Sequence, residues 1–267
     1  MDNTQPKGTA ASKQGTPRPD RSDRRYFFIH CLKTGGTTLY FQLKQIFGEQ
    51  AFYPASSDKG NINAVMTMEF LEKRMQSSAG DGIRMVTGHF PCCTRELLGA
   101  EFKTLTVLRE PVARTLSYLR HHRANSPEDQ HKSQEEIYND PFRFHGMIHN
   151  HMVKMFCLDI SDKKTGMLTH INFTREHLEA AKHTLETIDT VGVLEDYEAF
   201  CKNLKDAYGW DISAKVHANR TDASEPVSDA FRQRIAEDNA HDTEFNQFAL
   251  SLIERRLGDA KRFQRHR

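Results

Sequence analysis

The sequence has few cysteines, no long apolar segment and almost no net charge, and each absence excludes a class of protein. Its five cysteines are an odd number without a C-x-x-C pair, which argues against a disulfide framework and a zinc ribbon. No segment approaches the roughly 20 apolar residues that span a bilayer, and the N-terminus lacks the apolar core of a secretory signal. The net charge of +1 indicates neither a nucleic-acid nor a membrane partner. We therefore expect a soluble cytoplasmic protein with reduced thiols.

Short apolar runs alternate with helical patterns over most of the chain. Residues 1–23 are polar and rich in Gly and Pro, so we expect a disordered tail followed by a single domain over residues 24–267. Strands are predicted at residues 26–30, 83–87, 104–109 and 190–194, with a polar, His-rich insertion or lid at about residues 125–155. Helices are predicted at residues 176–185, 197–208 and 228–256. This alternation predicts an α/β protein, a three-layer α/β/α fold with a mostly parallel central sheet.

The strongest functional signal is the glycine loop, residues 30–38 (HCLKTGGTT), which follows the first predicted strand. Its two glycines let the backbone turn tightly and bring N–H groups to an anion, and the next helix points its positive dipole end at the same place. Lysine adds a charge and the threonines add hydroxyl donors. In a Walker A loop the lysine follows the glycines, whereas here it precedes them, which disfavours an ATP or GTP loop. The residues of this P-loop-like cradle are Lys33, Thr34, Gly35, Gly36, Thr37 and Thr38.

A second candidate anion site lies at the end of the third predicted strand. Arg109 occupies that position, and Pro111 follows where a helix tolerates proline in its first turn. A guanidinium recognises two phosphate oxygens at once, and the carboxyl ends of strands are where α/β sheets bind ligands. The alternative is that Arg109 forms a structural ion pair with Glu110 or Glu195.

Two segments resemble those of sulfotransferases that use 3′-phosphoadenosine 5′-phosphosulfate (PAPS). FFIHCLKTGGTTL at residues 27–39 is similar to their 5′-phosphosulfate loop, and TVLREPVARTLSY at residues 106–118 to their 3′-phosphate motif. The resemblance is greatest to the heparan sulfate and uronyl 2-O-sulfotransferases of the Golgi carbohydrate branch. It implies that Lys33 contacts the 5′-phosphate and the bridging oxygen, and that Arg109 and Ser117 bind the 3′-phosphate. It also implies that Arg220 and Thr221 belong to a loop that closes over the nucleotide.

The same resemblance implies the chemistry. A Gly-His pair at the end of the second strand supplies the base in the 2-O-sulfotransferases, and His89 matches it; a histidine satisfied in the core is the alternative. We expect PAPS-dependent O-sulfation of a carbohydrate or another hydroxylated acceptor by in-line displacement, with Lys33 neutralising the leaving phosphate and no metal ion. The Golgi enzymes carry an N-terminal membrane anchor that this sequence lacks, which favours a soluble bacterial-type member. An ATP-dependent kinase and a non-catalytic nucleotide-binding module remain alternatives.

The remaining polar positions give weaker signals. His145 and His149 have the i, i+4 spacing of a helical metal site, but no acidic ligand is nearby, so we interpret them as a solvated face or part of a basic acceptor groove. Residues 150–156 resemble a family segment that we interpret as structural. Glu195 is interpreted as a partner in a structural ion pair.

Overall fold

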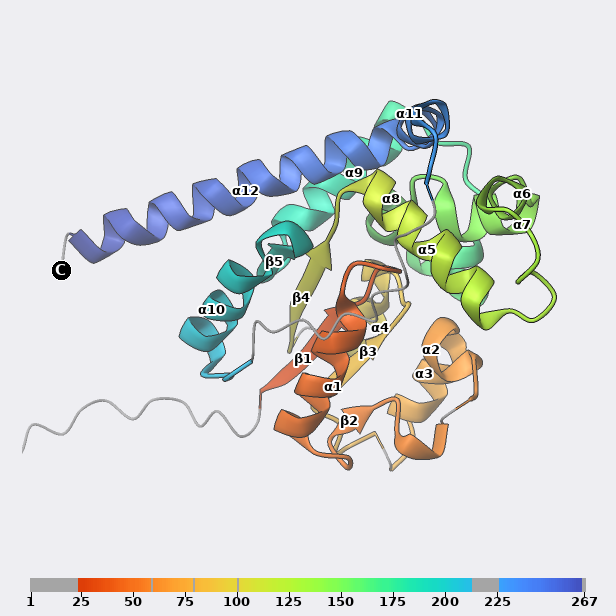
Figure 1. Ribbon diagram of the computed structural model, residues 1–267. Helices are drawn as coiled ribbons and strands as arrows, with labels where there is room; N and C mark the ends of the chain where they lie inside the picture. Colours follow the sequence, from red (N-terminus) through yellow and green to blue (C-terminus); the bar gives the residue numbers. More distant parts are fainter. Residues whose placement is uncertain (1–23, 59, 79, 100, 213–225, 266–267) are drawn as a thin grey trace, which may run out of the picture.

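The computed structural model describes residues 24–58, 60–78, 80–99, 101–212 and 226–265. Its centre is a five-stranded parallel sheet in the order β2-β3-β1-β4-β5 (Figure 1). The strands are β1 (Arg25–Ile29), β2 (Phe52–Tyr53), β3 (Met85–Gly88), β4 (Phe102–Leu108) and β5 (Thr190–Val193). The predicted α/β fold with a parallel sheet is confirmed.

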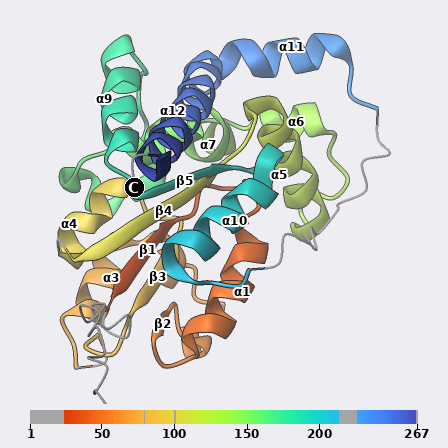
Figure 2. The same cartoon turned by 90° about the vertical axis from the view of Figure 1, so that its left-hand side faces the viewer.

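Helices cover both faces of the sheet (Figure 2). On one face lie α1 (Gly36–Phe47) and α10 (Tyr197–Tyr208); on the other lie α3 (Met68–Met75), α8 (His151–Cys157), α9 (Arg175–Glu186) and α12 (Ala240–Arg265). A third apolar cluster joins α5 (Pro111–Asn125), α6 (Gln134–Tyr138) and α11 (Asp229–Asp238). The short helices are α2 (Asn63–Met66), α4 (Arg95–Leu98) and α7 (Pro141–Arg143).

The apolar run of β1 is explained by its place in the middle of the sheet. Side chains alternate along a strand, so Tyr26 and Phe28 pack under α1 and α10, while Phe27 and Ile29 pack under the helices of the opposite face. These four side chains are nearly inaccessible to solvent. A strand buried on both faces has no polar side, which is why the sequence shows a continuous apolar run there.

The order of the strands positions the functional loops. From β1 the chain proceeds to β2 and β3 on one side, and β4 and β5 then lie on the other side of β1. The carboxyl ends of β1 and β4 therefore flank the point where the direction of winding reverses, which is where open α/β sheets bind ligands. The Thr106 hydroxyl donates a hydrogen bond to the Ile29 carbonyl at 3.0 Å and ties these two ends together.

The C-terminal part differs from the prediction, because the helix expected over residues 228–256 is two helices, α11 and α12. The break is at Asn239, whose buried side chain accepts a hydrogen bond from the Asn150 backbone N–H at 2.9 Å and donates one to Ile235 O at 2.8 Å. The predicted insertion also differs in part. Residues 151–156 form most of α8 and are fully buried, so this segment belongs to the core and not to a lid. None of the described helices is long and apolar enough to cross a membrane.

Candidate active site

The glycine loop leaves β1 through two residues with left-handed backbone. Lys33 has φ 64° and Gly35 has φ 87°, a conformation that is uncommon for a non-glycine residue such as Lys33. The buried Thr34 hydroxyl donates to Cys31 O at 3.0 Å, so it stabilises the turn from within. Helix α1 then begins at Gly36 without a side-chain cap and without an acidic residue in its first turn. Its first N–H groups are therefore available to an anion.

A network of buried residues supports the glycine loop from below. The Leu32 N–H donates to Nε2 of His151, the first residue of α8, at 3.2 Å. The start of α8 is held by Asp242 of α12, whose buried carboxylate accepts from the N–H groups of Met152 and Val153 at 3.1 and 2.8 Å. Residues 150–156, interpreted from sequence as structural, thus connect the loop to the C-terminal helix.

Arg109 contacts the glycine loop directly. Its Nη1 donates to Lys33 O at 3.1 Å, so the strand-end arginine and the loop lysine lie side by side. Both side chains are half-buried, and burial is the main reason why the pKa of each lies below its ordinary value. The positive charge of Arg109 lowers the pKa of Lys33 further. Two cations held together in a partly desolvated place are stabilised by a bound anion.

The acidic residues beside Arg109 are engaged elsewhere. The Glu110 carboxylate caps α5 by accepting from Val112 N at 2.9 Å and Ala113 N at 2.6 Å. The Glu195 carboxylate accepts from Glu110 N at 3.0 Å and joins the ends of β4 and β5. Over the described residues, neither acid forms a hydrogen bond or close ion pair with Arg109. The negative charges of Glu195 and Glu110 still raise the pKa of Arg109, so both acids stabilise its positive charge from a longer distance.

Helix α5 has further polar side chains that lie near the glycine loop. The pKa of His121 is lowered first by burial and then by the charge of Lys33, which places this helix face near the loop lysine. Ser117 is half-buried one turn before His121, and it forms no hydrogen bond with the described residues of the loop. Arg220 and Thr221 lie outside the described residues.

His89 is held in one tautomer by His30, the residue that follows β1. The parallel register pairs Ile29 with Gly88, so the next residues, His30 and His89, lie beside each other. The His89 Nδ1 is 2.8 Å from His30 O, and since a carbonyl oxygen only accepts, Nδ1 carries the proton. The Nε2 of neutral His89 therefore has a free lone pair. Burial is the main cause that lowers the pKa of His89 below 6.5, with Lys33 adding to it, which keeps the ring unprotonated at neutral pH.

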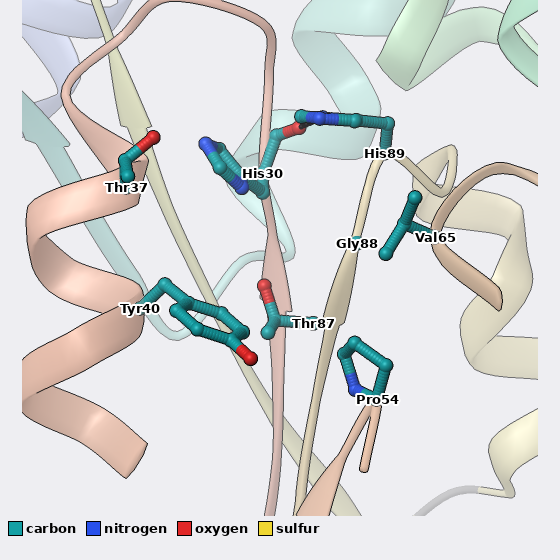
Figure 3. Close-up of a pocket in the computed structure, with 8 residues that line it drawn as sticks. All are labelled: His30, Thr37, Tyr40, Pro54, Val65, Thr87, Gly88 and His89. Atoms are coloured by element: carbon teal, nitrogen blue, oxygen red, sulfur yellow. Dashed lines mark hydrogen bonds between the residues drawn. The ribbon is translucent and has the colours of Figure 1, made fainter. Parts of the chain in front are cut away.

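A small pocket opens beside His89 (Figure 3). Its volume is about 150 Å³, and no Asp, Glu, Lys or Arg lines it. His30 and Tyr40 were not predicted from the sequence as pocket residues. The only available signals were the position of His30 at the start of the glycine loop and that of Tyr40 one turn after Thr37 on α1. The lining residues are His30, Thr37, Tyr40, Pro54, Val65, Thr87, Gly88 and His89.

The histidines of the expected insertion gather elsewhere. The ring of His145 lies 4.1 Å from that of His170 and 6.2 Å from that of His149, and the pKa of His149 is lowered to about 4, mainly by burial. Within the described ranges, no group of three or more potential ligands is arranged to hold a metal ion.

Comparisons with known proteins find similarity only among solved structures. No protein-family model and no curated protein matches the sequence. Six chains of solved structures match. One is a sulfotransferase from Alicyclobacillus acidocaldarius, which is 14% identical with a TM-score of 0.48, over 83% of this chain and 94% of that chain. A similarity this low carries no argument for the function of the chain.

Proposed function

We propose that this protein is a sulfotransferase that moves a sulfuryl group from PAPS to a hydroxyl group of its acceptor. The observation that carries the proposal is the contact of Arg109 with Lys33 O at the carboxyl ends of β4 and β1. PAPS bears phosphates on two sides of one ribose, and a ligand of this kind requires two neighbouring anion sites. The glycine loop with the start of α1 supplies the first site, and Arg109 supplies the second.

The chemistry of the site fits transfer to a hydroxyl group. The acceptor oxygen forms a bond to sulfur, the bond from sulfur to the bridging oxygen breaks, and adenosine 3′,5′-bisphosphate (PAP) leaves. The acceptor proton passes to Nε2 of His89, whose lone pair is free because Nδ1 donates to His30 O. Lys33 and the N–H groups of the loop stabilise the charge that develops on the leaving phosphate. Ser117 remains a predicted ligand of the 3′-phosphate.

The acceptor is proposed to present an uncharged end to the pocket. A cavity of about 150 Å³ without charged lining residues admits one small ring or a short chain that bears the hydroxyl group. A neutral sugar unit or another hydroxylated compound meets this requirement. A carboxylated or sulfated unit would have to leave its charge unpaired in the pocket, which costs free energy.

Nucleotide binding tests the two anion sites. PAP should raise the melting temperature more than ATP with Mg²⁺ does, and at 100 times its Kd the stabilisation is about 2.7 kcal/mol. Arg109→Gln should weaken PAP binding by about 10- to 100-fold. The matched control is Arg25→Gln. Arg25 begins β1, at the amino ends of the strands and therefore away from Lys33, and it donates a hydrogen bond to Asp81 O. Equal shifts with both nucleotides, or an unchanged Kd in Arg109→Gln, would remove the case for PAPS.

A sulfuryl-transfer assay distinguishes a sulfotransferase from a non-catalytic nucleotide-binding module. Labelled PAPS should transfer its sulfuryl group to at least one member of a panel of neutral sugars, phenols and alcohols. His89→Ala should abolish most of this transfer while the Kd for PAP stays within about twofold, because His89 is proposed to contact the acceptor and not the nucleotide. A variant that keeps full activity would exclude His89 as the base.

A further inference from the structure

The side chain of His30, the first residue of the glycine loop, lies between the start of α1 and the proposed base, His89. His30 follows the last residue of β1, and its ring is stacked on that of Phe28 at 5.2 Å and 13°. The ring is also 4.7 Å from the ring of His89. Figure 3 shows the His30 side chain between Thr37 of α1 and His89.

The other side of the His30 ring touches the start of α1. A Cβ atom added to Gly36 would lie 2.1 Å from both Cδ2 and Nε2 of His30. The ring therefore borders the first helical residue, at the end of α1 that lacks a side-chain cap and that is proposed to receive the phosphosulfate. The ring of His30 thus has the start of α1 on one side and His89 on the other.

The imidazole of His30 has hydrogen-bonding capacity that the fold does not use. Neither ring nitrogen forms a hydrogen bond with the part of the chain that the structure describes, although the ring lines the pocket. Burial, His89 and Lys33 together hold its pKa well below 6.5, so the ring is neutral at neutral pH. A neutral imidazole offers one N–H donor, and it offers it without adding a third full charge beside Lys33 and Arg109.

We propose, on the basis of the proposed function, that His30 is a second catalytic residue whose ring N–H hydrogen-bonds an oxygen of the sulfuryl group during transfer. The sulfuryl group must move from the loop side of the pocket to the acceptor at His89, and His30 lies between these two places. The proton of His30 stays on its ring throughout, and the acceptor proton passes to His89. A neutral donor placed there stabilises charge on the sulfuryl oxygens without competing for that proton.

The test compares two substitutions. His30→Phe keeps the stacking on Phe28 and the packing against Gly36 but has no N–H, whereas His30→Gln keeps an N–H donor. The Kd values for PAP and PAPS are measured by calorimetry. Turnover is measured as release of PAP from PAPS, with the best acceptor of the panel and with water alone.

His30→Phe should leave the Kd for PAP within about twofold, because PAP has no sulfuryl group. It should weaken PAPS binding by about two- to tenfold, as expected for one neutral hydrogen bond, and lower turnover by about 10²- to 10³-fold. His30→Gln should recover at least about tenfold of that turnover. Turnover of His30→Phe near the wild-type rate, no recovery in His30→Gln, or equal weakening of PAP and PAPS would overturn the role. If the wild-type chain binds neither nucleotide, or binds both without releasing PAP, the proposed function itself fails and the role of His30 fails with it.

Discussion

Replacing Gly36 with alanine probes the contact between the His30 ring and the start of α1. The added Cβ would lie 2.1 Å from two ring atoms, whereas ordinary contacts begin at 3.4 Å. The ring would have to move by roughly 1.3 Å, but Phe28 and His89 flank it. The backbone of Gly36 is not left-handed, so the effect of the substitution comes from this collision and not from backbone strain.

The expected change in the free energy of unfolding on Gly36→Ala is the sum of two opposing effects. Overpacking of a filled site costs about 1–3 kcal/mol, and alanine in a helix gains up to about 1 kcal/mol over glycine. Gly36→Ala should therefore lower the free energy of unfolding by about 1–2 kcal/mol in the wild-type background. In a His30→Ala background the ring is absent, and the same substitution should be neutral or stabilising. The coupling energy between Gly36 and His30 should be about 2 kcal/mol.

Urea denaturation of the four proteins of this double-mutant cycle measures the coupling energy. Gly258→Ala is a matched control, because Gly258 lies in α12 with nothing within 4 Å of an added Cβ, and it should stabilise the chain by up to about 1 kcal/mol. An equal cost of Gly36→Ala with and without the His30 ring would refute the contact. A stabilising effect in the wild-type background would do so as well.

Two further predictions concern protonation and the support of the loop. Because the pKa of His89 lies below 6.5 and the neutral ring is the proposed base, kcat/KM for sulfuryl transfer should fall toward acid pH with a midpoint below 6.5; a pH profile with its acidic midpoint above about 7 would contradict this. Asp242→Ala should lower the free energy of unfolding by at least about 3 kcal/mol, because two buried N–H groups of α8 and the nearby Arg114 lose their acidic partner. Urea denaturation measures this loss, and a value under about 1 kcal/mol would show that α8 does not depend on Asp242.

The sequence patterns predicted four of the five strands and missed β2, one of the two edge strands. The strand predicted at residues 190–194 is observed as Thr190–Val193, and that predicted at 26–30 as Arg25–Ile29, because continuous apolar runs give clear signals even when they are short. Strand β2 was missed, since two residues, Phe52 and Tyr53, are too few to show any periodicity. The break at Asn239 was missed because its partner, Asn150, is 89 positions away in the chain.

The candidate site could be predicted only at residues whose type and position in the sequence indicate a function. Lys33 and Arg109 stand out beside glycines and at a strand end, and the structure brings them into contact. Their roles toward PAPS stay predictions, as does that of Ser117. His30 gave only the weak signal of its position in the glycine loop, because its place in the pocket depends on the pairing of β1 with β3, and that pairing follows from the topology of the sheet and not from local sequence.

The link from Asp242 through α8 to Leu32 has a consequence for biosynthesis. Strand β1 and the glycine loop are translated well before Asp242, whose carboxylate holds α8 under the loop. A nascent chain that still lacks α12 therefore has every loop residue and no finished support beneath it. The proposed nucleotide site is therefore complete only after α12 has been made and has packed against α8.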